Sequence, residues 1–127
     1  MGAHTDSVSR GPGINDDRGD TIGILEIAQA LSQFKVSNAM RFGWWSGDEI
    51  GLLGSEHDVL ALTAVKQAKI RAYLNYDMIA SPNHVYAIYD GDGSAFNDTG
   101  PASSAEIERF FQSFFTTSSA KLHSYGF

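Results

Sequence analysis

The 127-residue chain contains no cysteine. Disulfide bonds, a catalytic thiolate and cysteine-ligated zinc sites are therefore excluded. No apolar run approaches the roughly 20 residues that a membrane-spanning helix needs. The first residues, Met1-Gly2-Ala3-His4, show no signal-peptide pattern. Any chemistry or metal binding must therefore use groups other than thiols.

Acidic residues outnumber basic residues in this chain. Nine lysines and arginines face 15 aspartates and glutamates, which gives a formal net charge of -6. This charge argues against nucleic acid and anionic membranes as partners. The length suits a single domain over residues 1–127 that buries roughly two-thirds of its unfolded surface. A hydrophobic content of 43% predicts a globular chain.

Several catalytic motifs are also missing. No G-x-S-x-G elbow is present, which removes the common serine-hydrolase interpretation. The run Gly11-Pro12-Gly13 lacks the Gly-Lys-Ser/Thr ending of a phosphate-binding loop. No H-E-x-x-H helix offers a local zinc motif. A catalytic site, if present, must be assembled from separate segments.

One stretch organises the rest of the chain. Apolar and aromatic residues from Met40 to Trp45 predict a buried strand, and Ser46-Gly47 ends it. After Glu49 the apolar residues recur three or four apart, which predicts a helix to about Val65. Asp48 and Glu49 thus lie where a strand gives way to a helix, and ligands bind at that edge of α/β sheets.

The other periodic segments complete an alternating pattern. We expect a helix from Thr21 to Leu31 with Asp20 as its N-cap, and a helix opened by Pro101. Alternating apolar residues predict strands at 70–77 and 84–89. The order of helices and strands predicts an α/β fold, a layered sheet with helices on both faces.

Acids and one histidine recur at the expected strand ends and loops: His4 with Asp6, Asp16 with Asp17, Asp48 with Glu49, and Asp77. Any one of them is more typical of a helix cap or a solvated loop. Four such places favour a shared cation, because imidazole and carboxylate are ligands suited to zinc.

Four blocks resemble the di-zinc aminopeptidases of metallopeptidase family 28, in the family's order and spacing. They are Ala3-His4-Thr5-Asp6-Ser7-Val8, Gly11-Pro12-Gly13-Ile14-Asn15-Asp16-Asp17, Trp44-Trp45-Ser46-Gly47-Asp48-Glu49-Ile50-Gly51-Leu52-Leu53-Gly54-Ser55 and Tyr73-Leu74-Asn75-Tyr76-Asp77-Met78-Ile79-Ala80-Ser81-Pro82. The resemblance implies the central part of a zinc-exopeptidase fold of the phosphorylase/hydrolase-like kind.

The resemblance also implies roles. His4 and Asp77 would bind one zinc ion, Glu49 a second, and Asp16 would bridge both. Asp48 would act as the general base toward the attacking water. Asp6 would hydrogen-bond His4 and fix its tautomer. The implied activity is removal of N-terminal, apolar residues from peptides, with peptide as the partner and a secreted, extracellular location.

Departures from the family leave two hypotheses open. Asp48 stands where the family has a glutamate. Aspartate is one methylene shorter, and drawing the carboxylate back by about 1 Å can lower the catalytic rate roughly 10²-fold. Neither His84 nor His123 matches the family's last zinc-ligand histidine. The chain resembles the middle of a family member, cut at both ends. The first hypothesis is an aminopeptidase with two zinc ions. The second is a non-catalytic, truncated peptidase-fold module that acts in binding or self-assembly, with one zinc ion or none.

Two further expectations concern strands and turns. Only three residues precede His4, too few for the strand that the family has there. Missing strands would leave sheet edges uncovered, so we expect homo-oligomerisation through them.

Asp90-Gly91-Asp92-Gly93-Ser94 is similar to the start of a calcium loop but lacks the spaced glutamate, which favours a plain turn.

Overall fold

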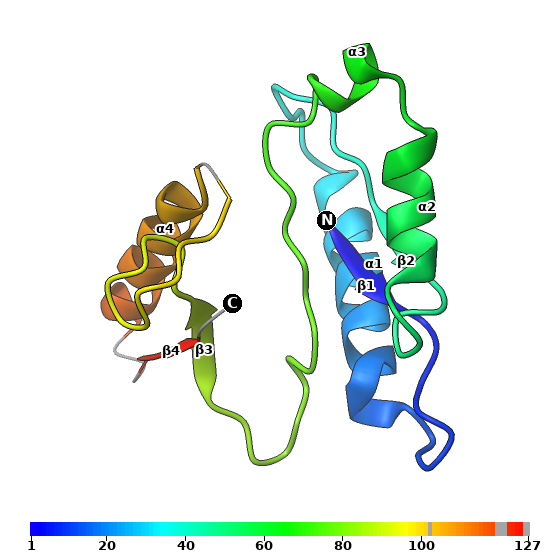
Figure 1. Cartoon of the computed structure of the whole chain (residues 1–127), viewed down its shortest axis with the longest axis horizontal. Coiled ribbons are helices and arrows are strands. Elements are labelled where there is room, and N and C mark those ends of the chain that lie inside the picture. The colour runs from blue at the N-terminus through cyan, green and yellow to red at the C-terminus, as the bar shows by residue number, and fades with distance from the viewer. Residues whose placement is uncertain (102, 119–121, 126–127) are drawn as a thin grey trace. The chain divides into compact units, whose positions relative to one another are not determined.

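A computed structural model of the chain describes residues 1–101, 103–118 and 122–125. The chain divides into two compact units, Met1–Pro82 and Asn83–Phe127. Figure 1 shows both units, and each is described by itself. The single domain expected over residues 1–127 stays a prediction.

The first unit is built on a short parallel sheet. Strand β1 (Gly2–His4) pairs in parallel with β2 (Gly43–Trp45), with His4 opposite Trp45. On the other side of β1, Gly2 forms a parallel bridge with Asn75. The strand that the sequence predicted at 70–77 is thus reduced to a bridge, with hydrogen bonds from Gly2 N–H to Leu74 O and from Tyr76 N–H to Gly2 O.

The expectation that no strand precedes His4 is wrong. Three residues suffice for β1 because its backbone is hydrogen-bonded on both sides, to β2 and to the segment around Asn75. His4 is therefore anchored as the last residue of a central strand. Ala3 is 1% exposed, so this strand lies in the small core of the unit.

Helices follow the sheet strands (Figure 1). A five-residue π-helical turn, Ile14–Arg18, leads into α1 (Gly19–Leu31), which packs on β1 and buries Ile24 completely. The helices α2 (Leu53–Ala61) and α3 (Ala64–Gln67) follow β2, so the helix predicted after Glu49 begins later and is interrupted. Asp20 is not the N-cap of α1; Arg18 is, and Asp20 lies buried in the first turn.

The second unit is a parallel pair of strands joined through a helix. Strand β3 (Tyr86–Tyr89) pairs with β4 (Leu122–Tyr125), and α4 (Ser104–Thr117) connects them. The ring of Tyr86 lies 5.1 Å from that of Phe115, which packs β3 against α4. The helix predicted to open at Pro101 is present, but it begins later, at Ser104, with Ser103 as its N-cap. Residues 119–121 and 126–127 lie outside the described residues.

The observed elements confirm an α/β fold in its coarse form. Parallel pairing with helical connections is the arrangement that strands need when they run in one direction. Within the described ranges, no helix combines the length and hydropathy required to cross a bilayer.

Candidate metal centre

His4 is fixed at the carboxyl end of β1. Its backbone N–H donates to Asp17 Oδ2 at 3.0 Å, and its carbonyl accepts from the Thr21 hydroxyl at 2.8 Å. The residue is 4% exposed. The backbone of His4 is therefore held in place by the start of α1, and its side chain is buried, which favours a well-positioned ligand.

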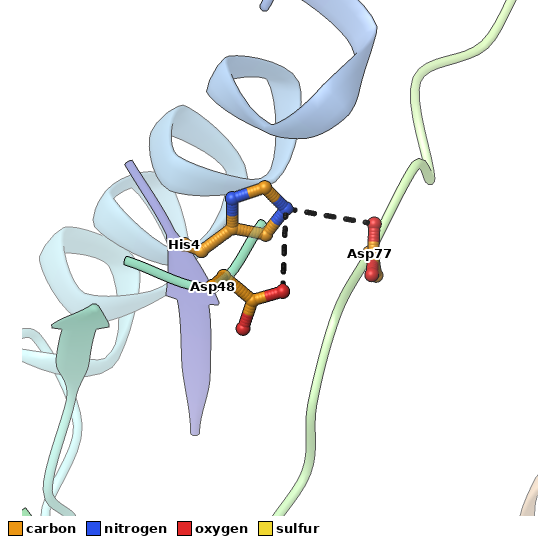
Figure 2. Close-up of side chains that lie close together, drawn as sticks. All are labelled: His4, Asp48 and Asp77. Atoms are coloured by element: carbon orange, nitrogen blue, oxygen red, sulfur yellow. Dashed lines mark ion pairs between the residues drawn. The ribbon is translucent and has the colours of Figure 1, made fainter. Parts of the chain in front are cut away.

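Carboxylates from three separate segments surround the Nε2 atom of His4. Asp16 Oδ1 lies 3.0 Å away, while Asp48 Oδ2 and Asp77 Oδ1 each lie 4.0 Å away. Figure 2 shows Asp48 and Asp77 reaching the same imidazole nitrogen from different parts of the unit. The carboxyl ends of parallel chain segments meet at one edge of a sheet, which explains the convergence.

Two sets of donors are close enough to share an ion. One ligand atom each of His4, Asp48 and Asp77 lie within 4.8 Å of one another. The same holds for His4, Asp16 and Glu49. The structure thus brings together all four residues predicted as metal ligands, together with the predicted base.

The residues present fit a divalent metal. Glu49 Oε1 is buried and has no hydrogen-bond partner, which is costly unless a cation or a donor reaches it. A mixed set of imidazole nitrogen and carboxylate oxygens is suited to zinc. Asp16 is 38% and Asp77 48% exposed, so the cluster is open to solvent on one side.

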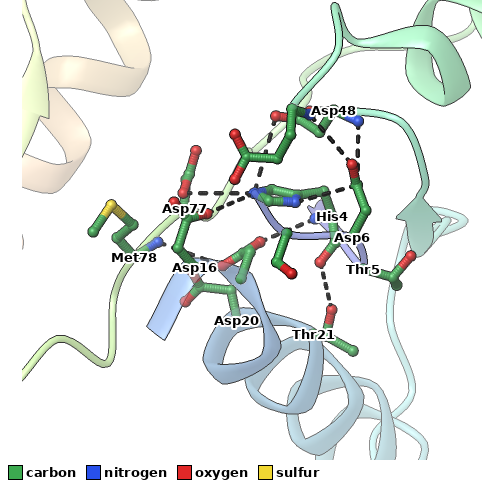
Figure 3. A network of polar contacts seen from close by, with 12 residues as sticks. His4, Thr5, Asp6, Asp16, Asp20, Thr21, Asp48, Asp77 and Met78 are labelled. Atoms are coloured by element: carbon green, nitrogen blue, oxygen red, sulfur yellow. Dashed lines mark hydrogen bonds and ion pairs between the residues drawn. The ribbon is translucent and has the colours of Figure 1, made fainter. Parts of the chain in front are cut away.

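Asp6 lies on the other side of the imidazole. Its Oδ1 is 3.4 Å from His4 Nδ1, and its two oxygens accept the backbone N–H groups of Asp48 at 3.1 Å and Glu49 at 3.3 Å (Figure 3). Burial alone would raise the pKa of Asp6, but the two amide donors outweigh it and hold that pKa below its usual value. Asp6 therefore holds the turn that carries Asp48 and Glu49 beside His4, while the buried His4 Nδ1 itself makes no hydrogen bond.

Two glycines shape the loops that deliver these acids. Gly13 has φ of 67°, and a Cβ there would come within 2.7 Å of Ser7 Cβ, so glycine is required before the turn that holds Asp16. Gly47 has φ of 77° directly before Asp48. Both loops thus depend on backbone conformations that other residues rarely adopt.

Two buried acids, Asp17 and Asp20, hold the segment after Asp77 in place beside the cluster. The sequence pattern did not predict this role. Asp17 Oδ1 accepts the Met78 N–H at 3.4 Å, and Asp20 accepts the Ile79 N–H at 3.1 Å and 3.2 Å. Both are completely buried. They hold the segment after Asp77 against the first turn of α1. The pair Asp16-Asp17 was the available signal, but nothing in the pattern separates the inward acid from the outward one.

The charges of the cluster perturb one another. Burial alone would lower the pKa of the His4 imidazole, but four carboxylates outweigh it and raise that pKa: Asp17, Asp48, Asp77 and Asp16. Burial and the neighbouring charge of Asp16 raise the pKa of Asp77. Burial, with the contact to Asp20, raises the pKa of Asp17 to about 8. Excess negative charge of this kind is relieved when a cation binds.

An α/β sheet edge that gathers an imidazole and several carboxylates is typical of a metal-dependent enzyme and is a candidate metal site. Comparison with known proteins makes the class specific. The model of peptidase family M28 matches residues 1–126. The chain therefore belongs to peptidase family M28, a metal-dependent family.

Curated relatives agree with the family. The chain is 60% identical over 117 residues to the probable leucine aminopeptidase 2 of Aspergillus fumigatus, covering 92% of this chain. It is 58% identical over 115 residues to leucine aminopeptidase 2 of Arthroderma otae, covering 91% of this chain. In both cases the matched part is 23% of the relative, so the chain spans about a quarter of the length of these proteins.

Proposed function

We propose that this chain carries part of the metal centre of a zinc-dependent aminopeptidase, which removes N-terminal, apolar residues from peptides. The family and the leucine aminopeptidases among the relatives support a peptidase. The observation that carries the proposal is the convergence of carboxylates from separate segments on His4 Nε2.

Each residue has a role that its position supports. As the family resemblance implies, His4 and Asp77 would hold one zinc ion, Glu49 the other, and Asp16 both. Asp77 lies in a donor set with His4 and Asp48, and Asp16 in one with His4 and Glu49. Asp6, between His4 Nδ1 and two amide N–H groups, would fix the imidazole tautomer. When bound, zinc polarises the peptide carbonyl and lowers the pKa of the attacking water.

Asp48 would take the proton from that water. Its Oδ2 lies 4.0 Å from His4 Nε2, beside the ligands and 26% exposed, so it can reach a molecule entering from solvent. The partly exposed carboxylates would also attract the free amino group of a peptide. This attraction supports an enzyme that acts at the N-terminus of its substrate.

The proposal is tested by measuring zinc content and then the release of a chromophore from an N-terminal leucine substrate, with and without chelator. We expect at least one equivalent of zinc and turnover that stops on chelation. Zinc below one equivalent together with no turnover would overturn the enzyme and favour a non-catalytic module.

One observation favours such a module as the second candidate. Within the described residues, β2 pairs only with β1, so its other edge carries unpaired backbone groups. Unpaired edges recruit a further strand, and a second copy of this chain could supply it. Sedimentation velocity over a range of concentrations decides this point, because a monomer at every concentration rules the assembly out.

A location outside the cell is proposed on the family resemblance alone. Detection of the native protein in the medium of its source cells, compared with the cell lysate, tests it. Protein found in the lysate and absent from the medium would contradict a secreted protein.

A further inference from the structure

A second cluster of acids, which shares no residue with the proposed zinc centre, lies in the second unit. It joins the turn after β3 to α4 through Asp90, Asp92 and Glu108. One carboxylate oxygen of each lies within 4.8 Å of the others. Asp90 is 0% exposed and Glu108 is 4% exposed. Buried carboxylates are costly unless something cationic or a proton compensates them.

Asp90 has a buried oxygen that nothing satisfies. Its Oδ2 accepts the backbone N–H groups of Ala95 at 2.9 Å and Phe96 at 2.8 Å. Its Oδ1 is buried and has no hydrogen-bond partner. Because Oδ2 is held by two amides, Oδ1 is the oxygen left to face the cluster. An orphaned buried acceptor of this kind needs an explanation, and a bound cation is one.

The other two acids are held in place by hydrogen bonds. The Asp92 N–H donates to Glu108 Oε2 at 3.1 Å, and the Ser94 N–H donates to Asp92 Oδ1 at 2.9 Å. Gln112 on the next turn of α4 donates to Glu108 Oε1 at 2.7 Å. The carboxylates are therefore positioned before any ion arrives, which lowers the entropy that binding costs.

Glycine makes the approach of the turn to the helix possible. A Cβ at Gly91 would come within 2.6 Å of the Ser104 carbonyl group, so only glycine lets the turn lie on the first turn of α4. Glu108 lies one helical turn further along. The glutamate that a calcium loop requires is missing from the local sequence, and the fold supplies one from the helix instead.

The donor set selects a hard cation. All three ligands are oxygens, which suits calcium or magnesium better than zinc. Calcium, with bonds to oxygen of about 2.3–2.6 Å, accepts flexible cages of protein oxygens. Magnesium, at about 2.0–2.1 Å, demands near-octahedral geometry and usually keeps several waters, so a set of three protein carboxylates suits calcium better. We propose that Asp90, Asp92 and Glu108 bind a calcium ion that ties the turn after β3 to α4.

Calcium titration of the unmodified chain by calorimetry and by NMR tests the proposal. We expect calcium to shift the amide resonances of Asp92, Ala95 and Phe96, and to bind more tightly than magnesium. Shifts confined to the surroundings of His4, or preference for magnesium, would overturn it. No calcium binding would also overturn it, and would indicate that the acids share a proton.

Matched variants locate the ion. Glu108→Gln and Asp90→Asn should weaken calcium binding by about tenfold or more, because each removes a charged ligand. Glu106→Gln, on the exposed side of the same helix, should bind calcium like the unmodified chain. Equal affinities of the Glu106 and Glu108 variants would overturn the site. If the Glu108 variant fails to fold by circular dichroism, the NMR shifts of the unmodified chain decide.

Discussion

Among the described residues, acids gather around His4 in the first unit and around Asp90 in the second, and the two clusters differ in composition. The cluster around His4 mixes one imidazole nitrogen with carboxylates from separate loops, and Asp77 is 48% exposed. The cluster around Asp90 contains oxygens alone, and Asp90 and Glu108 are buried. Each cluster includes an exposed carboxylate, Asp77 in the first and Asp92 in the second, but the other two acids of the second cluster are buried.

The difference in donor atoms separates two kinds of metal site. Nitrogen favours zinc, and oxygen alone favours calcium. The comparison therefore predicts that changes to one cluster leave metal binding at the other unchanged.

The largest effect is expected for His4→Ala. Both donor sets of the first cluster use His4, so zinc affinity should fall by at least about 100-fold, since loss of an outer partner alone costs about 10–100-fold. Competition with a chromophoric zinc chelator measures it. His57→Ala, on the exposed face of α2, is the control. Equal zinc affinities of the two variants would contradict His4 as a ligand, and lost calcium binding in His4→Ala would contradict the independence of the two clusters.

The second-largest effect is expected for Asp48→Glu. The longer side chain restores the family's glutamate and moves the carboxylate outward by about 1 Å, a displacement that can be worth about 10²-fold in rate. We expect release of the leucine chromophore to rise toward that factor. Asp98→Glu, exposed in the second unit, should leave the rate unchanged. Unchanged or lower turnover in Asp48→Glu would argue against Asp48 as the base.

Asp6→Asn should have a smaller effect. An amide oxygen keeps one acceptor for the Asp48 and Glu49 N–H groups but removes the charge beside His4 Nδ1. We expect zinc affinity to fall by about tenfold, as for other outer partners of a ligand histidine. The same chelator competition measures it against Asp98→Asn. A loss as large as that of His4→Ala would make Asp6 a direct ligand.

The fold was predictable where periodicity is long. The helices at Thr21–Leu31 and after Pro101 were predicted from apolar spacing, and α1 and α4 confirm them. The strand predicted at 70–77 is not confirmed, because alternation alone does not show whether a neighbour pairs with the backbone; here only Asn75 forms a bridge. The strand β1 is three residues long, too short to carry a period.

The convergence of the site was predictable from chemistry at strand ends, together with the resemblance. Each of His4, Asp16, Glu49 and Asp77 follows an apolar segment or lies in a glycine-bounded loop, and the structure gathers them. Glu108 could not be found in this way. It lies 16 residues after Asp92 in a helix, and only the fold brings its Oε2 to the Asp92 N–H.

The smallest effect concerns the pH dependence of stability in the metal-free chain. Burial raises the pKa of Asp17 to about 8, against an ordinary value of about 3.9 in the unfolded chain. Between these values the folded chain holds a proton that the unfolded chain has lost. Stability therefore falls as the pH rises through this window. The raised pKa values of Asp77 and His4 act in the same direction.

Urea unfolding with chelator present, at about pH 5 and about pH 7, measures this slope, which for one proton is at most about 1.4 kcal/mol per pH unit. Burial lowers the pKa of the Met1 amino group, and this acts in the opposite direction. Asp17→Asn should flatten the slope, because a neutral side chain binds no proton in either state. Zinc should flatten it too, since the cation stabilises the ionised carboxylates. A stability that rises from pH 5 to pH 7 would mean that Asp17 is ionised in the fold, and the first cluster would then carry more negative charge than we infer.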